Sequence, residues 1–236
     1  MSFEAVGAER DRLKRAAALR AIDYVENGMV VGLGTGSTAY FVVEGLGQRV
    51  AQGLKIVGIP TSERTAAQAR QLSIPLATFA EHQRLDLTID GADEVERGTL
   101  HLIKGLGGAL LREKVVAAAS ERLVIVVDRD KLVDRLGEHT PVPVEVTQFG
   151  WQATAASLER LGGKPELRHA APDHAFITDN GNYILDSRFA QLDDPGAIER
   201  AIAMIVGVIE SGLFIGRTSA VVVASDDGVQ VMTPDR

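Results

Sequence analysis

Short apolar segments alternate with helical segments along the first half of this chain, and this alternation restricts its fold more than any other feature. Apolar runs typical of buried strands lie near residues 29–33, 54–59, 85–90 and 123–127, and helical patterns lie near 38–51, 62–71 and 109–119. A further helical pattern precedes the first strand and ends at Asn27-Gly28. Strands that alternate with helices usually pair in parallel. We therefore predict an α/β fold with a doubly wound, largely parallel sheet of the Rossmann-like type.

One segment of this half does not fit the alternation. The stretch "TLHLIK", residues 99–104, follows Asp90 after only about eight residues, whereas a parallel crossover needs about a dozen or more. Its pairing stays open at this point.

The pattern changes at about Pro141. A strand "VPVEV", a helix "WQATAASLERLG", a strand "KPELRH", a hairpin "AFITDNGNYILD" and a helix from Pro195 follow one another, and Asn180-Gly181 is a strong signal for the hairpin turn. This order predicts a small α+β insert of the ferredoxin-like type. The chain then returns to the main sheet through "TSAVVVASDDGVQVM". We predict a catalytic α/β domain of residues 1–136 plus 207–236, and a small subdomain of residues 137–206.

Composition excludes several classes of function. The formal charge is −7, with 25 basic residues dispersed among 32 acidic ones, which argues against a nucleic-acid surface. Apolar runs stay well short of the roughly 20 residues that span a bilayer, and the N-terminal stretch lacks the apolar core of a signal peptide. The 236 residues include no cysteine, and the histidines show no metal-ligand spacing. We expect a cytoplasmic protein without a nucleic-acid, membrane or metal partner.

The stretch "VVGLGTGSTA", residues 30–39, connects a predicted strand to a predicted helix. One interpretation is a tight turn and nothing more. A dinucleotide fingerprint is a second, because Gly32 and Gly34 match its first two glycines, but Ser37 stands in place of the third and no acid ends the next strand. The P-loop is excluded because no GK[ST] follows.

The remaining interpretation of this loop is a cradle for one small phosphate. The backbone amides of Gly36, Ser37 and Thr38 open a helix, and a helix N-terminus attracts anions. The hydroxyls of Thr35, Ser37 and Thr38 would add further donors. If the ligand is a phosphate, the site must be locally basic despite the net charge.

The second candidate group is "LTIDGADEV". The strand delivers Asp90 to its carboxyl end, the edge where open α/β sheets bind ligands, and Asp93 follows in the loop. A solvated acidic turn is the alternative. Gly91 and Ala92 between the acids permit a close approach of backbone to ligand, and neighbouring carboxylates can divide acid and base roles.

The third group is "IKGLGGALLREK". Lys104 precedes a loop with Gly105, Gly107 and Gly108, and Glu113 is expected in the second turn of the helix that this loop opens. An ordinary helix acid paired with a nearby base is the default interpretation of Glu113. The alternative is catalytic, because glycine amides and a lysine ammonium can stabilise an oxyanion, and a carboxylate near a helix N-terminus stays ionised.

Taken together, these segments and several others resemble those of a known protein family. In this order, "GLGTGSTA", "DGADE", "KGLGGALLREK", "VDRDKLVDRLG", "PVPVEV", "TDNGNYILD" and the late "GLF" resemble ribose-5-phosphate isomerases of the type A family along essentially the whole chain. The resemblance implies interconversion of D-ribose 5-phosphate and D-ribulose 5-phosphate in the pentose phosphate pathway, without metal or cofactor. It also implies a homodimer or a larger homo-oligomer, such as a homotetramer.

The resemblance further assigns site residues. It makes Glu113 the proton acceptor and places the sugar-binding loops at Thr35–Thr38, Asp90–Asp93 and Lys104–Gly107, with Lys131 as a further ligand contact. One departure is visible, because Leu106 interrupts a glycine run that the family often keeps unbroken. Donation from its backbone amide is retained, but glycine's conformational freedom is lost there.

The chemistry of such an isomerase matches the residues. Glu113 can move the proton between C1 and C2, while Asp90 can shuttle protons between the oxygens. Asp93 would act as an orienting group, and Lys104 with the glycine amides would stabilise the enediolate. The aspartate and lysine roles could be exchanged, including in ring opening. Lys14 is a weaker candidate for the phosphate, since a lysine on a surface helix is usually only solvated.

Two alternatives belong to other classes. A sugar-phosphate sensor domain of a transcription regulator would share the fold and the phosphate loop but would need a DNA-binding segment. A related isomerase or lactonase acting on another sugar phosphate should lack the joint set of Asp90, Lys104 and Glu113.

Overall fold

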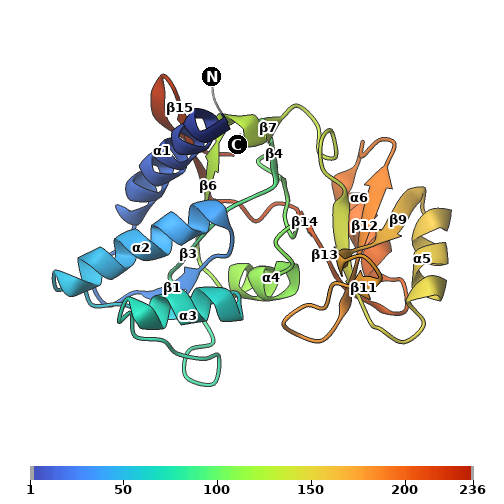
Figure 1. Ribbon diagram of the computed structural model, residues 1–236, viewed down its shortest axis with the longest axis horizontal. Coiled ribbons are helices and arrows are strands. Elements are labelled where there is room, and N and C mark those ends of the chain that lie inside the picture. Colours follow the sequence, from blue (N-terminus) through green and yellow to red (C-terminus); the bar gives the residue numbers. More distant parts are fainter. Residues whose placement is uncertain (1–2, 235–236) are drawn as a thin grey trace. The chain divides into compact units, whose positions relative to one another are not determined.

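A computed structural model of the chain describes residues 3 to 234, with side chains described from residue 7 onward (Figure 1). The chain forms two compact units. The first consists of Met1–Ala92, Arg112–Leu132 and Arg217–Arg236, and the second consists of Asp93–Leu111 and Val133–Gly216. The bounds of the second unit differ from those of the predicted subdomain, residues 137–206. The predicted division into domains stays a prediction.

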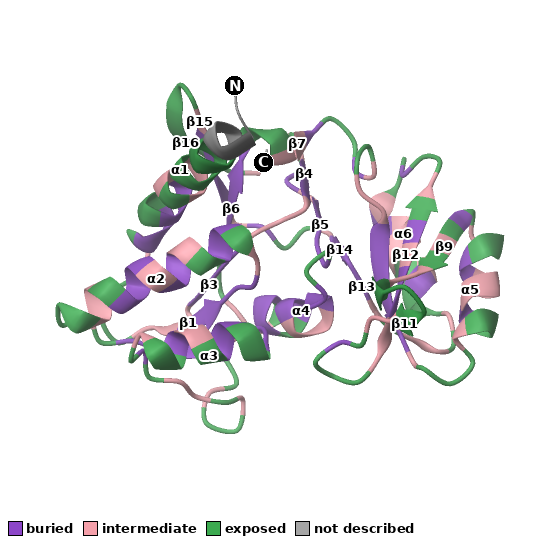
Figure 2. Ribbon diagram, viewed as in Figure 1, coloured by how far each residue is buried: buried purple, intermediate pink, exposed green. Residues whose placement is uncertain are grey.

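The first unit is built on a six-stranded sheet with the order β16-β15-β6-β3-β1-β2. All neighbouring strands pair in parallel except β15 and β16, which form an antiparallel hairpin. The strands are β1 (Val30–Leu33), β2 (Val57–Pro60), β3 (Leu87–Asp90), β6 (Leu123–Asp128), β15 (Ala220–Ser225) and β16 (Gly228–Met232). Strands β3 and β6 are buried at every residue, as Figure 2 shows in purple. Parallel sheets of this kind need cover on both faces, which explains the continuous apolar runs in the sequence.

Helices cover both faces of this sheet. They are α1 (Phe3–Ile22), α2 (Ser37–Ala51), α3 (Glu63–Gln71) and α4 (Leu110–Ala118). Val31 packs in a cluster with Ala17 of α1 and Val43 of α2. The next residue, Gly32, faces Val116 of α4, because a Cβ added to it would lie 2.6 Å from that side chain. Successive residues of a strand point to opposite faces, so the predicted doubly wound α/β fold is confirmed.

The second unit contains a four-stranded antiparallel sheet with the order β13-β8-β12-β9. Its elements along the chain are β8 (Val142–Val146), α5 (Trp151–Arg160), β9 (Gly163–Leu167), β12 (Tyr183–Phe189), α6 (Pro195–Ala203) and β13 (Val208–Ser211). This is the β-α-β-β-α-β order of the ferredoxin-like motif. The expected α+β insert is therefore present, with β13 as an additional last strand.

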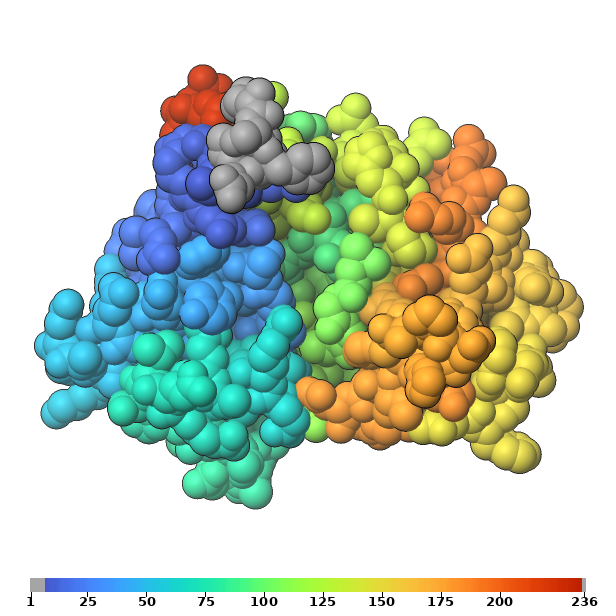
Figure 3. Space-filling view, in the orientation of Figure 1, coloured from blue at the N-terminus to red at the C-terminus, as the bar shows by residue number. Residues whose placement is uncertain are grey.

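The hairpin expected around Asn180-Gly181 is wrong in its pairing. A turn does form there, with the Gly181 amide donating to the Thr178 carbonyl at 2.9 Å. However, β12 pairs on one side with β8 and on the other with β9, so both of its edges are occupied. The antiparallel hairpin lies earlier, between β10 (His169–Ala171) and β11 (His174–Ala175). It is largely exposed, and the orange atoms of this segment lie at the surface in Figure 3.

The segment whose pairing the sequence left open belongs to a different sheet. Strand β5 (Leu102–Ile103) pairs antiparallel with β4 (Glu94–Glu96) and with β14 (Leu213–Phe214). With β7 (Leu132–Val133) these strands form a second four-stranded sheet of order β14-β5-β4-β7. The hairpin between β4 and β5 is short because Gly98 and Leu100 both adopt positive φ, 79° and 54°. An antiparallel neighbour needs no crossover, which removes the conflict with loop length.

Candidate functional site

The order of the sheet in the first unit points to one place for a ligand. Strand β1 connects to β2 on one side, whereas the chain from β3 leads to β6 on the other side. The loops after β1 and β3 therefore diverge at the carboxyl edge of the sheet. Open α/β sheets bind ligands in the crevice at such a switch point. The phosphate-loop candidate follows β1 and Asp90 ends β3, so the fold places these two predicted groups at that point.

Asp90 is joined directly to the loop after β1. Its side chain is buried, and its Oδ1 accepts the Thr35 amide at 3.0 Å and the Gly91 amide at 2.7 Å. Gly34 makes this approach possible, since a Cβ there would lie 2.6 Å from the Cα of Asp90. The carboxylate and the loop are therefore parts of one rigid arrangement.

The Thr35 side chain stabilises this loop from inside the protein. It is buried, and its Oγ1 lies 2.7 Å from Thr61 Oγ1, 2.8 Å from Ser62 Oγ and 3.1 Å from Thr65 Oγ1. Thr65 Oγ1 also donates to the Gly34 carbonyl at 3.0 Å. The Thr35 hydroxyl thus anchors the loop to the start of α3. Thr61, Ser62 and Thr65 were not among the predicted site residues, and their only signal in the sequence is the hydroxyl-rich segment "TSERT" after the second strand.

The start of α2 has the features of an anion site. Gly36 is the N-cap with φ 127°, a conformation that favours glycine, and it carries no side chain that could cap the helix. Ser37 is exposed, and Thr38 is buried in the first turn. The first helical amides can therefore donate to an external anion, assisted by the helix dipole.

The two lysines expected near the phosphate occupy different environments. Lys131 ends the short 3-10 helix Arg129–Lys131, which follows β6 and so begins at the same carboxyl edge of the sheet. Lys14 lies on α1, where its Nζ is 3.8 Å from Asp11 one turn earlier. Lys131 is thus placed at the edge where the ligand is expected, whereas the recorded ion pair of Lys14 is local to its own helix.

In the second unit, Asp93 and the glycine loop are directly bonded. The Asp93 amide donates to the Ile103 carbonyl at 2.8 Å, which ends the β4–β5 hairpin, and its Oδ2 accepts the Leu106 amide at 2.9 Å. Lys104 leaves the end of β5 and is buried, with its Nζ 5.6 Å from the centre of the Phe214 ring. Its own amide donates to the Gly212 carbonyl at 2.9 Å. The hairpin therefore places the predicted orienting acid beside the predicted electrostatic loop.

Within the glycine loop, the structure shows which positions need glycine. Gly105 and Gly108 have φ of 106° and 82°, and a Cβ on Gly105 would lie 2.8 Å from the Leu110 Cβ. A Cβ on Gly108 would collide with the ring of Phe176. Leu106 is not among the residues with positive φ, so its side chain causes no backbone strain. The break in the glycine run is therefore tolerated, but the Leu106 amide is engaged by Asp93.

Arg168 also contacts this loop, and no pattern in the sequence indicates this contact. It lies between β9 and β10, and its Nη1 donates to the carbonyls of Gly105 at 2.9 Å and Leu106 at 3.0 Å. Its Nε and Nη2 donate to the two carboxylate oxygens of Asp186 at 2.8 and 2.5 Å. The loop is thereby tied to the ferredoxin-like sheet.

Glu113 lies in the first turn of α4 rather than in the expected second turn, and the residue is only 4% exposed. The preceding residue, Arg112, has its Nη1 2.8 Å from Glu63 at the start of α3. Burial removes competing water, which suits a group that accepts a proton from carbon.

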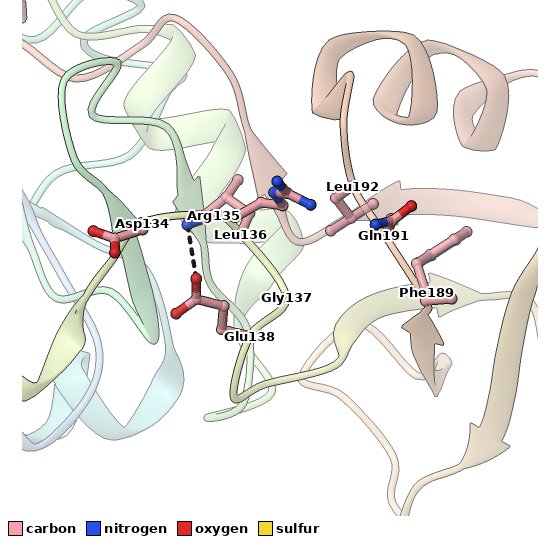
Figure 4. Close-up of a pocket in the computed structure, with 9 residues that line it drawn as sticks. Asp134, Arg135, Leu136, Gly137, Glu138, Phe189, Gln191 and Leu192 are labelled. Atoms are coloured by element: carbon pink, nitrogen blue, oxygen red, sulfur yellow. Dashed lines mark hydrogen bonds between the residues drawn. The ribbon is translucent and has the colours of Figure 1, made fainter.

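A cavity of about 310 Å³ in the second unit involves other residues (Figure 4). It is lined by residues 134–138 and 189–192, and none of the predicted site residues is among them. Nearby, the buried carboxylate of Glu94 accepts the amides of Gly137, His139 and Thr140 at 2.6 to 2.7 Å. This bonding holds the 137–140 loop in place and identifies Glu94, which follows the predicted acids directly, as a structural residue.

Among residues 3 to 234, no helix combines the length and the apolar character required to cross a bilayer. Among the side chains that the structure describes, from residue 7 to residue 234, no three of histidine, aspartate or glutamate gather in an arrangement that could hold a metal ion.

Known proteins are similar to this chain over nearly its whole length. A family model described as ribose 5-phosphate isomerase A (phosphoriboisomerase A) matches residues 57–228. A ribose-5-phosphate isomerase A from Gloeobacter violaceus is 63% identical over 224 residues, covering 95% of this chain and 97% of that protein. The solved structure of ribose 5-phosphate isomerase A from Methanocaldococcus jannaschii is 41% identical, with a TM-score of 0.91 over 95% of this chain and 99% of that one. A D-ribose-5-phosphate isomerase solved in complex with phospho-erythronic acid is 38% identical, with a TM-score of 0.91 over 94% and 98% of the two chains.

Proposed function

Because this chain belongs to the ribose 5-phosphate isomerase A family, we propose that it interconverts D-ribose 5-phosphate and D-ribulose 5-phosphate. The reaction moves a carbonyl between C1 and C2 through an enediolate, and the proposal requires neither a metal nor a cofactor. The observation that carries it is the bond between the Thr35 amide and the Asp90 carboxylate at the switch point of the sheet. This bond fixes a potential acid or base beside a helix N-terminus suited to a phosphate.

Each chemical step has a candidate residue. Glu113 takes the proton from one carbon and returns it to the other, and Asp90 moves protons between the two oxygens. Asp93 orients the loop through its bond to the Leu106 amide, and Lys104 with the glycine amides stabilises the negative charge of the enediolate.

Phosphate binding is assigned to the first turn of α2. The amides of Ser37 and Thr38, together with their hydroxyls, would hold the terminal phosphate, with Lys131 as an added positive charge. The Thr35 hydroxyl has a different part, because it is bonded inside the protein and holds the loop in shape. Binding of the remote phosphate would orient the sugar and reduce the entropic barrier to reaction.

A coupled assay tests the proposed reaction. Ribulose 5-phosphate formation from ribose 5-phosphate is measured with purified protein in the presence of a metal chelator. Turnover that the chelator leaves intact is expected. Absence of turnover, or turnover that depends on added metal, would contradict the proposal.

The phosphate assignment predicts a selective change in substrate affinity. Replacing Ser37 by Ala together with Thr38 by Val should raise the KM for ribose 5-phosphate by about ten-fold, because two hydroxyl donors to a charged group are lost. Turnover of unphosphorylated ribose, measured in parallel, should change little, since that sugar places nothing in the loop. Equal proportional losses on both substrates would assign the loop to structure instead.

Assembly and location form part of the same proposal. We expect a homodimer or homotetramer, supported by three large apolar side chains of the second unit, Phe149, Met204 and Val206, which are each at least 84% exposed beside one apolar hollow. Light scattering after size exclusion should give a dimer or larger, and replacing Phe149 and Val206 by Ser should shift the population to monomer. A monomeric starting protein would contradict this.

A cytoplasmic location is proposed because a chain without cysteine needs no oxidising compartment.

A further inference from the structure

We propose that Arg168 is a positioning residue of the isomerase, which sets the peptide planes of the glycine loop after Lys104. The inference rests on the proposed function, because that function assigns this loop to the stabilisation of the enediolate. All of the contacts that support it lie within the second unit.

The peptide between Gly105 and Leu106 is held at both ends. Its carbonyl accepts Arg168 Nη1 at 2.9 Å, and its N–H donates to Asp93 Oδ2 at 2.9 Å. A trans peptide is planar, with its C=O and N–H pointing in opposite directions. These two charged partners therefore fix the rotation of this peptide and align Asp93 with the loop.

The same arginine also sets the orientation of the next peptide, between Leu106 and Gly107. The Leu106 carbonyl accepts the same Nη1 at 3.0 Å, so the N–H of that peptide, which belongs to Gly107, points away from Arg168. A cation on the carbonyl also polarises the peptide and makes its N–H a stronger donor. Gly107 carries no side chain, and a Cβ there would meet nothing within 4 Å, so its amide lies at an open part of the loop. Arg168 thus directs the donor that the proposal gives to the enediolate.

Arg168 is itself rigidly placed. Its side chain is only 12% exposed and forms a two-pronged ion pair with Asp186 of β12. Its guanidinium also lies 5.8 Å from the centre of the Phe176 ring, which packs against Gly108 at the far end of the loop. Arginine is required because a lysine ammonium has no planar fork that could bind a carboxylate and two carbonyls together.

The test is a set of four variants with one matched control. Arg168→Met should lower kcat by about 10- to 100-fold, as expected for a displaced electrostatic donor, and change KM by less than about three-fold. Arg168→Lys and Asp186→Asn should give intermediate losses. Arg188→Met, which removes an exposed arginine from β12, should keep the original kcat. In Arg168→Ala, added guanidinium ion should restore part of the lost kcat.

A readout independent of activity separates this inference from the proposed function. Hydrogen exchange of the Leu106 amide, which donates to Asp93, should accelerate in Arg168→Met and stay unchanged in Arg188→Met. If the original protein shows no isomerase activity, the proposed function fails, and the exchange result still decides whether Arg168 orders the loop. The inference is overturned by a folded Arg168→Met with unchanged kcat, or by unchanged exchange at the Leu106 amide. If Arg168→Met does not fold, the same criteria apply to Arg168→Lys and Asp186→Asn.

Discussion

Replacing Glu113 by Gln is expected to lower the turnover of ribose 5-phosphate by a factor of about 10² to 10⁴, with little change in substrate binding. The amide has nearly the shape of the carboxylate but cannot accept a proton from carbon. Because the side chain is buried in the first turn of α4, no water molecule can readily take over as the base. The measurement is kcat and KM in the coupled assay, with binding of a non-reacting sugar phosphate followed by calorimetry.

Glu121→Gln provides the matched control for this variant. Glu121 is an exposed carboxylate shortly after the end of α4, so its replacement should leave both constants unchanged. Near-normal turnover in Glu113→Gln would remove this residue from the mechanism. A loss of binding equal to the loss of turnover would instead make Glu113 a substrate ligand.

Replacing Lys104 by Met is expected to cost about 3 kcal/mol of transition-state stabilisation, seen mainly as a fall in kcat of about two orders of magnitude. Methionine retains much of the volume of the lysine stem, but the positive charge is lost and with it the contact of Nζ with the Phe214 ring. The charge matters most when the enediolate carries its negative charge, which is why the effect falls on turnover. Steady-state kinetics and thermal unfolding of the variant check this result.

Lys164→Met is the control for Lys104. Lys164 is exposed on β9 of the same unit, so its replacement removes an equal charge from the protein without altering the loop. If Lys104→Met raised KM while kcat stayed intact, Lys104 would be a uniform binding group. The stabilisation of the enediolate would then depend on the glycine amides alone.

Much of the first unit could be predicted from local patterns. Continuous apolar runs such as "LVIVVD" predict buried strands, and Asp90 and Glu113 follow directly as the residues at the end of a strand and the start of a helix. The short hairpin of β4 and β5 could not be predicted, since its two-residue strand β5 is too brief to show a period. The expected hairpin at Asn180-Gly181 failed for a related reason. The turn was recognised correctly, but a turn does not determine the partner of the strand that follows it, and β12 found two other partners.

The sequence by itself determined the α/β class and the ferredoxin-like insert, and it singled out the candidate site residues, because each depends on neighbours within about one element. Only the tertiary structure decided how those residues are held. The Thr35 hydroxyl meets partners 26 to 30 residues away, and Arg168 meets Gly105 across 63 residues. Such contacts depend on strand order and on which side chains reach a shared face, and no local period encodes them. The loop that resembles a phosphate site in the sequence therefore owes its rigidity to a buried hydroxyl network, and the glycine loop owes its orientation to an arginine from the distant connection between β9 and β10.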